Sequence, residues 1–216
     1  MTLAHLKEGA RGGTPGFPTL KLECRIHQEG TGQGMNNGFT LWFTGLSGAG
    51  KSTIAEIVGS RLEDAGRNVE YLDGDVVRTH LSKGLGFSKE DRDTNIERIG
   101  WVASRLTRHG AAVLVSAISP YEDTRRKARE LVGEFGPFIE VYVEASVEKC
   151  AERDVKGLYE KAFAGEIKEF TGVSDPYEAP SSPELVVNTE EDSAEQSAKR
   201  VLDKLEELGL LYEVRV

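Results

Sequence analysis

The sequence predicts an α/β fold built on a doubly wound parallel sheet of about five strands. Short β-prone apolar runs alternate with longer amphipathic stretches from residue 39 to residue 208, which is typical of successive βαβ units. Residues 111–118 form a nearly continuous apolar run, as expected for a central parallel strand that helices cover on both faces. In such a sheet, ligands bind beyond the carboxyl ends of the strands.

The predicted strands and helices follow one another closely along most of the chain. Gly66 and Gly110 are placed to end helices, and Ser88 with Asp91 resembles a capping box. Residues 154–183 have scattered Gly, Pro and aromatic residues without a clean period. The predicted elements are strands at 39–44, 69–72, 111–118, 138–144 and 185–187, and helices at 51–65, 88–109, 121–133, 147–153 and 193–208.

The first residues of the chain have a different composition from the rest. Residues 1–38 contain many Gly, Thr, Pro and Asn and few apolar clusters, so we expect an N-terminal extension or linker without stable structure. Within it, residues 19–26 alternate in hydropathy and could form an edge strand. The folded domain is expected at residues 39–216.

The composition excludes several classes of function. The formal net charge is −9, which argues against nucleic acid or an anionic membrane as the main partner. No apolar run approaches the roughly 18 residues of a spanning helix, and the N-terminus has no apolar signal core. Cys24 and Cys150 are the two cysteines, too few for a disulfide framework, so a reducing, cytoplasmic location is expected.

A glycine-rich stretch between the first strand and the first helix matches G-x-x-x-x-G-K-[ST] at every fixed position. It consists of Gly45, Leu46, Ser47, Gly48, Ala49, Gly50, Lys51 and Ser52, followed by Thr53. Glycines let backbone N–H groups converge on phosphate oxygens at a helix N-terminus. Lys51 can reach the β- and γ-phosphates, and the Ser52 hydroxyl can bind Mg²⁺. The motif therefore predicts binding of a nucleoside triphosphate on a P-loop NTPase-like fold.

Two carboxylates follow the second predicted strand. Asp73 and Asp75 flank Gly74, a sequence that also suits a simple turn. A phosphotransferase needs one carboxylate near its metal and one that orients or deprotonates the attacking hydroxyl. Beside a phosphate loop, these two side chains are candidates for both roles.

Positive and polar side chains come next along the chain. Arg92, Asn95 and Arg98 are three residues apart, so they share one stripe of a predicted helix. Arginine forks suit phosphate or sulfate oxygens, and an exposed Phe87 could stack on a base. By pattern alone, a solvated charged helix capped by a core phenylalanine is the favoured explanation of these residues.

Taken together, these motifs resemble adenylyl-sulfate kinases (APS kinases). The resemblance is collinear over about residues 39–210. It implies transfer of the γ-phosphate of ATP, with Mg²⁺, to the 3′-hydroxyl of adenylyl sulfate, giving 3′-phosphoadenylyl sulfate for sulfate assimilation. It also implies a homodimer, and it leaves open an association or fusion with an ATP sulfurylase. The segments that carry it are 41–53, 72–78, 85–88, 91–96, 118–121, 156–159, 169–172 and 175–180.

The resemblance implies roles for individual residues. Asp73 would serve the metal and Asp75 the hydroxyl, while Lys156 would approach the phosphates and Arg153 the adenine of ATP. Ser119 would donate a hydrogen bond to substrate or phosphate rather than carry a phosphate, because direct transfer needs only positioning and charge compensation. The residues that would hold adenylyl sulfate are Arg78, Phe87, Arg92, Asn95, Ile118 and Phe170, with Asp75, Ser119 and Lys156.

The irregular residues 154–183 are interpreted as a mobile lid, because so long a stretch without regular structure is unusual inside a compact domain. Closure of a lid would exclude water from the reaction.

Three residues depart from the family pattern, namely Val76, Glu122 and Val155, which stand where Asn, Arg and Pro are usual. Glu122 removes a positive charge from the neighbourhood of the site.

Two alternatives remain open at this point. The chain could be a P-loop kinase for another small-molecule hydroxyl, which a comparison of acceptors would distinguish. It could also be a regulatory nucleotide-binding domain without turnover, attached to an ATP sulfurylase. Lys51, Ser52, Asp73 and Asp75 are all present, which favours an active kinase over such a domain.

Overall fold

Five parallel strands form a single sheet in the order β2-β3-β1-β4-β5. The computed structural model describes residues 37–211, so the strand expected at 19–26 lies outside the described residues. The strands are β1 (Phe39–Thr44), β2 (Val69–Asp73), β3 (Ala112–Ser116), β4 (Phe138–Glu144) and β5 (Leu185–Asn188). The expected doubly wound parallel sheet is confirmed.

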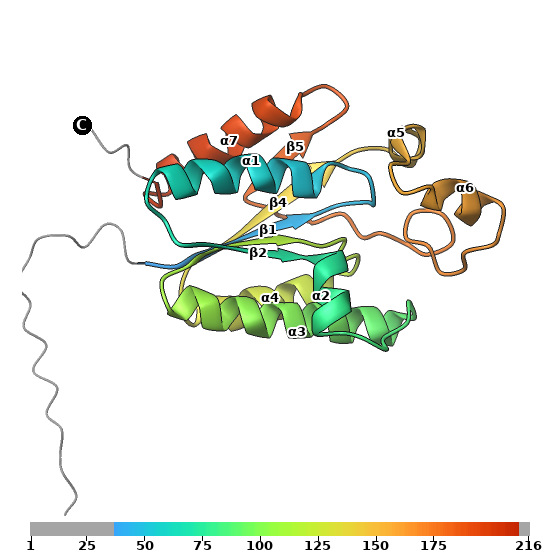
Figure 1. The fold of residues 1–216 in the computed structure, drawn as a ribbon, viewed down its shortest axis with the longest axis horizontal. Coiled ribbons are helices and arrows are strands. Elements are labelled where there is room, and N and C mark those ends of the chain that lie inside the picture. The colour runs from blue at the N-terminus through green and yellow to red at the C-terminus, as the bar shows by residue number, and fades with distance from the viewer. Residues whose placement is uncertain (1–36, 212–216) are drawn as a thin grey trace, which may run out of the picture. The chain divides into compact units, whose positions relative to one another are not determined.

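Helices cover both faces of the sheet (Figure 1). On one face lie α1 (Lys51–Asp64) and α7 (Ala194–Glu207), and on the other lie α3 (Lys89–Arg108) and α4 (Glu122–Gly133). The short α5 (Val147–Arg153) and α6 (Leu158–Phe163) lie beyond one end of the sheet in the same view. Within residues 37–211, every helix is too short or too polar to cross a membrane.

Two helices differ from the expectation. The Asp73-Gly74-Asp75 sequence starts a helix, α2 (Gly74–His80), because the Asp73 side chain caps its N-terminus by accepting a hydrogen bond from the Asp75 N–H. In the stretch expected to be irregular, α6 forms one short helix, capped by the Asp154 carboxylate. Both helices have seven residues or fewer, and hydrophobic periodicity cannot identify helices this short.

The central strand β1 is buried along its whole length, and its side chains alternate between two cores. Phe39, Leu41 and Phe43 pack in the cluster that includes residues of α1 and α7. Trp42 packs in the cluster that includes residues of α3 and α4. Burial on both faces explains why β1 and β3 appear as apolar runs in the sequence.

The reversal of strand order at β1 determines where a ligand can bind. From β1 the chain runs to β2 and β3 on one side and then crosses to β4 and β5 on the other. Such a switch point opens a crevice beyond the carboxyl ends of the strands. The phosphate loop follows β1, Asp73 ends β2, and Ala117 follows β3. The fold therefore brings three sequence-distant segments to one edge.

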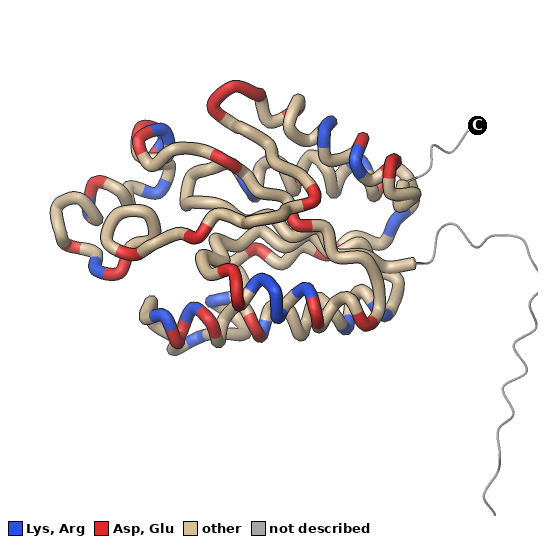
Figure 2. Tube along the Cα trace, turned by 180° about the vertical axis from the view of Figure 1, so that it is seen from behind, with Lys and Arg blue, Asp and Glu red and all other residues tan. Residues whose placement is uncertain are grey.

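Charged residues of both signs are interspersed along the helices (Figure 2). This pattern produces exposed pairs one helical turn apart, such as Arg126–Glu130 and Lys199–Asp203, at 2.8 and 2.6 Å between nitrogen and oxygen. Exposed pairs of this kind contribute about 0–1 kcal/mol each. The stability of the domain therefore depends on its two cores rather than on its surface charge.

We expect Gly100→Leu to lower the free energy of unfolding by about 1–3 kcal/mol, because overpacking displaces a close helix contact. A Cβ on Gly100 of α3 would lie 2.9 Å from the Cβ of Ala128 on α4. Urea denaturation measures the change. Gly133→Leu is the control, because a Cβ at this exposed end of α4 would meet nothing within 4 Å. Equal losses in the two variants would contradict the predicted packing.

Candidate functional site

The loop between β1 and α1 has a backbone that requires glycine. Gly45 has φ +146°, and a Cβ there would lie 2.4 Å from the carbonyl oxygen of Val143 on β4, so any side chain would displace the loop. Gly50 forms the N-cap of α1 without a side-chain hydrogen bond to the first turn. The N–H groups of that turn can therefore serve an anion.

Five consecutive carbonyls of this loop accept hydrogen bonds from side chains. Those of Gly45 and Leu46 accept from Lys51 Nζ at 2.9 and 2.7 Å. The next three, of Ser47, Gly48 and Ala49, accept from Tyr159 Oη at 2.9 Å, Arg153 Nη1 at 3.3 Å and Thr189 Oγ1 at 2.8 Å. With their carbonyls held in this way, the peptide units can direct N–H groups into the concavity of the loop.

The sequence motif did not reveal Tyr159 or Thr189. The only signal for Thr189 was its position just beyond the last predicted strand.

The ammonium group of Lys51 is almost fully buried, with 8% of the residue exposed. The pKa of Lys51 is lowered from 10.5 to about 8, mainly by burial and in part by the nearby Lys156, while Cys150, Asp73 and Asp75 act in the opposite direction. A buried ammonium bound only to two carbonyls is well suited to exchange them for phosphate oxygens.

The Ser52 hydroxyl donates to Asp73 Oδ2 at 2.7 Å. A hydroxyl and a carboxylate side by side are hard oxygen donors, so these residues fit Mg²⁺. Within residues 37–211, no group of three His, Cys, Asp or Glu side chains is arranged to hold a metal ion. Further ligands would therefore be phosphate oxygens and water, as is usual for Mg²⁺ at phosphate sites. Asp75, two residues further on, forms an exposed ion pair with Lys156.

A second group of side chains comes from α2, α3 and the segment between them. The ring of Phe87 is 54% exposed, and the guanidinium of Arg78 lies 4.7 Å from its centroid. Arg92 is buried and donates from Nη1 to Thr171 Oγ1 at 2.7 Å. Asn95 is also buried, and its Oδ1 has no hydrogen-bond partner among the described residues. An unpaired buried acceptor in a cavity wall is a candidate contact for a ligand.

The loop and the second group line one cavity of about 870 Å³, near the upper end of the range for small-ligand sites. All the residues predicted for the site line this cavity except Gly45 and Leu46. Those two residues belong to the loop, but Leu46 packs in the core. The structure thus brings together residues from position 47 to position 170, although it does not test their individual roles.

Ser119 has a different environment from the one expected. It is 1% exposed, its hydroxyl accepts a hydrogen bond from Trp42 Nε1 at 3.0 Å, and it donates to the Ala117 carbonyl at 3.2 Å. Its single proton is therefore already used within the protein. Ser119 also has φ +42°, which is uncommon for a residue with a side chain.

The segment expected to be a lid is tied to the rest of the site. Arg92 Nη2 donates to the Glu169 carbonyl and lies 3.5 Å from Asp175 Oδ2. Phe170 lines the cavity and meets the ring of Tyr159 edge to face at 5.0 Å. Glu122, which departs from the family pattern, accepts from Ser181 Oγ and does not line the cavity.

Comparisons with known proteins agree with this arrangement. A family described as adenylylsulphate kinase matches residues 37–188. The adenylyl-sulfate kinase of Rippkaea orientalis is 59% identical over 174 residues, which cover 81% of this chain and 94% of that protein. The chain belongs to the adenylylsulphate kinase family. Membership confirms the resemblance of the motifs and the P-loop kinase class of the fold.

Two further relatives of this family member are informative. The structure of the Mycobacterium tuberculosis APS kinase CysC in complex with AMPPNP and APS is 43% identical, with a TM-score of 0.76 and coverage of 79% of this chain and 98% of that chain. A probable bifunctional SAT/APS kinase 2 of Sorangium cellulosum is 57% identical over 173 residues, which are 80% of this chain but only 29% of that protein. The family therefore includes both single-domain and longer chains.

The buried Lys51 predicts how stability changes with pH. Between pH 8 and 10.5 the unfolded chain binds more protons at Lys51 than the folded protein, so this residue makes stability rise with pH. We expect the free energy of unfolding of the wild type, relative to Lys51→Met, to increase by about 2 kcal/mol from pH 7 to pH 9.5. Urea denaturation at both pH values measures it. A difference between wild type and Lys51→Met that is the same at both pH values would refute the prediction.

Proposed function

We propose that this protein transfers the γ-phosphate of ATP to the 3′-hydroxyl of adenylyl sulfate, giving ADP and 3′-phosphoadenylyl sulfate. The observation that carries the proposal is a single cavity with a phosphate loop on one side and an exposed phenylalanine between arginines on the other. This arrangement suits two nucleotides that meet with the terminal phosphate of one near the ribose of the other. Membership of the adenylylsulphate kinase family supports this choice of substrates.

The phosphate loop would bind ATP. The N–H groups at the start of α1 would surround its phosphates, and Lys51 would leave the Gly45 and Leu46 carbonyls to contact the β- and γ-phosphates. Ser52 and Asp73 would hold Mg²⁺, which when bound neutralises charge on the phosphates. Arg153 already contacts the Gly48 carbonyl, so we assign it to hold the loop as well as to approach the adenine.

The second group would bind adenylyl sulfate. Phe87 would stack on the adenine, with Phe170 on the opposite face, and Arg78 would contact an anionic group. The unpaired Oδ1 of Asn95 would accept a hydrogen bond from the acceptor nucleotide. Arg92 has Thr171 and the Glu169 carbonyl as partners, so its contribution would be to hold that side of the cavity beside the substrate.

In the transfer step, the 3′-oxygen would attack the γ-phosphorus in line while the bond to the bridging oxygen of ADP breaks. Asp75 would orient the hydroxyl and accept its proton. Lys156, paired with Asp75 here, would move to the phosphates when they bind, since a triphosphate attracts it more strongly than one carboxylate does. Ser119 is assigned to position Trp42 and the loop that contains Ile118, because its proton is already donated.

We propose in addition that the chain forms a homodimer in the cytoplasm, as the resemblance implies. A light-scattering mass near twice 23.7 kDa would support the dimer, and a monomer mass would contradict it. Residues 39–216 would be the catalytic domain, with a mobile lid at 154–183 and residues 1–38 as an extension. A bifunctional relative keeps association with a sulfurylase open.

The function is tested by measuring ADP release with ATP, Mg²⁺ and a panel of acceptors. We expect kcat/KM for adenylyl sulfate to exceed that for nucleosides and sugars by orders of magnitude. In the same assay with adenylyl sulfate, we expect Lys51→Ala to lower kcat by about 10²-fold or more, because the positive charge that compensates the transferring phosphate is lost. A better acceptor of another class would establish a different kinase. No turnover with any acceptor would favour a regulatory nucleotide-binding domain.

We expect Phe87→Ala to weaken binding of adenylyl sulfate by about 1–3 kcal/mol, because base stacking is lost, with little change in the KM for ATP. Steady-state kinetics with each substrate varied in turn measures both constants. Phe163→Ala is the matched control, since Phe163 is a similarly exposed phenylalanine that does not line the cavity. An unchanged KM for adenylyl sulfate in Phe87→Ala would refute the stacking role.

A further inference from the structure

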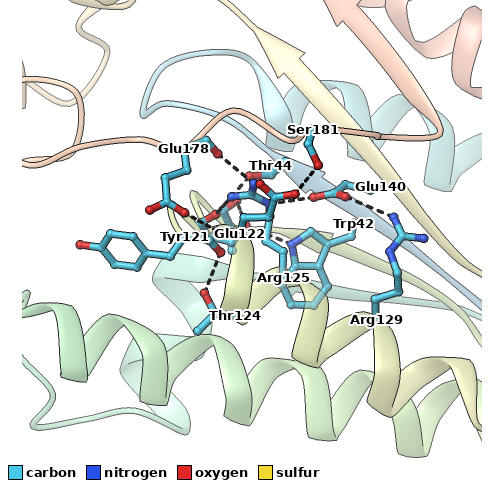
Figure 3. A network of polar contacts seen from close by, with 12 residues as sticks. Trp42, Thr44, Tyr121, Glu122, Thr124, Arg125, Arg129, Glu140, Glu178 and Ser181 are labelled. Atoms are coloured by element: carbon cyan, nitrogen blue, oxygen red, sulfur yellow. Dashed lines mark hydrogen bonds and ion pairs between the residues drawn. The ribbon is translucent and has the colours of Figure 1, made fainter.

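A buried arginine contacts the segment after β3, which lines the cavity, and a second segment within the predicted lid (Figure 3). Arg125 of α4 is 2% exposed. Its Nη1 donates to the Ser119 carbonyl at 2.7 Å, and its Nη2 donates to the Glu178 carbonyl at 2.8 Å. One planar guanidinium thus joins the segment after β3 to the second half of the predicted lid.

The first of these segments is the loop Ala117–Tyr121, which we call the β3 loop. Four of its residues, Ala117 to Pro120, line the cavity. Ser119 has φ +42°, a conformation that persists only where surrounding contacts hold it. The contacts around its carbonyl are the Arg125 guanidinium at 2.7 Å and the Thr44 hydroxyl at 3.5 Å. The hydrogen bond from the charged guanidinium is the shorter and the stronger of the two.

The second segment is Tyr177–Glu178, which we call the lid root. The Glu178 N–H donates to the Pro120 carbonyl, and Glu178 Oε2 accepts from the Glu122 N–H, both at 2.8 Å. Tyr177 Oη and Thr44 Oγ1 are 2.9 Å apart. The lid root and the β3 loop therefore contact each other directly as well as through Arg125.

The guanidinium itself is held by an ion-pair network of no net charge. Arg125 Nε donates to Glu140 Oε1 at 2.8 Å, and Arg129 Nη2 donates to Glu140 Oε2 at 3.2 Å. Arg129 also forms a double hydrogen bond with Glu184, at 2.6 and 2.8 Å. Arg129 thus shares the anchor of Arg125, but among residues 37–211 its hydrogen bonds go to Phe138, Glu140 and Glu184 and not to the β3 loop or the lid root.

We propose that Arg125 is a positioning residue that couples the lid root to the β3 loop, so that the lid and the wall of the acceptor site move together. The link to acceptor affinity rests on the proposed function, whereas the coupling itself does not. Lysine cannot replace arginine here, because a single ammonium group cannot reach Glu140 and both carbonyls in one plane.

Hydrogen exchange of the unliganded protein tests the coupling. In Arg125→Lys we expect amides of both the β3 loop and residues 169–178 to exchange about tenfold faster, the factor that matches one lost charge-assisted hydrogen bond. Arg129→Lys, which disturbs the same Glu140, should leave both segments unchanged. Equal effects of the two variants, or a change in one segment alone, would overturn the proposal.

A second variant avoids the buried site. Glu178→Ala removes an exposed side chain of the lid root and its bond to the Glu122 N–H. We expect faster exchange in the β3 loop as well as in the lid root. If Arg125→Lys fails to fold, this variant still tests whether the lid root and the β3 loop are coupled, and exchange confined to the lid root would contradict that coupling.

Steady-state kinetics then distinguishes a positioning role of Arg125 from a general effect on the stability of the fold. We expect Arg125→Lys to raise the KM for adenylyl sulfate about tenfold, while the KM for ATP changes less than twofold, and Arg129→Lys to change neither. A parallel rise of both constants would show a merely structural role. If the wild type does not use adenylyl sulfate, the proposed function fails, but the exchange experiment still decides the coupling.

Discussion

The structure depends first on the conformation of the loop between β1 and α1. An anion can enter this loop only if its N–H groups point inward, which requires its carbonyls to find partners elsewhere. Side chains of Lys51, Tyr159, Arg153 and Thr189 supply those partners for five carbonyls in a row. The phosphate site is therefore shaped by β5, α5 and α6 as much as by its own glycines.

The same arrangement explains the buried ammonium of Lys51. Removing a charge from water is unfavourable, as the lowered pKa of Lys51 reflects. The Gly45 and Leu46 carbonyls offset part of this cost through two short hydrogen bonds. Because the ammonium is already desolvated and close to the site, it would only have to exchange these two carbonyls for phosphate oxygens when a phosphate arrives.

Two buried arginines hold different parts of the irregular segment on the opposite side of the cavity. Arg92 contacts residues 169–175 from α3, and Arg125 contacts the lid root from α4. Each arginine donates hydrogen bonds to backbone or side-chain oxygens of a segment that has little regular structure of its own. The second half of the expected lid is thus attached to the helices beneath it, and the irregular backbone has defined partners.

The sequence by itself determined the class of fold and the location of the site. Apolar runs on β1 and β3 indicated a parallel sheet, and the glycine motif indicated where phosphate binds, because both signals depend on neighbouring residues. The sequence did not reveal α2 or α6, whose caps matter more than their periodicity, nor that the Ser119 hydroxyl donates to the Ala117 carbonyl. Tyr159, Thr189 and Arg125 became visible only in the tertiary structure. Tyr159 and Thr189 contact loop residues 112 and 140 positions away, and no local pattern records a contact that exists only after the chain has folded.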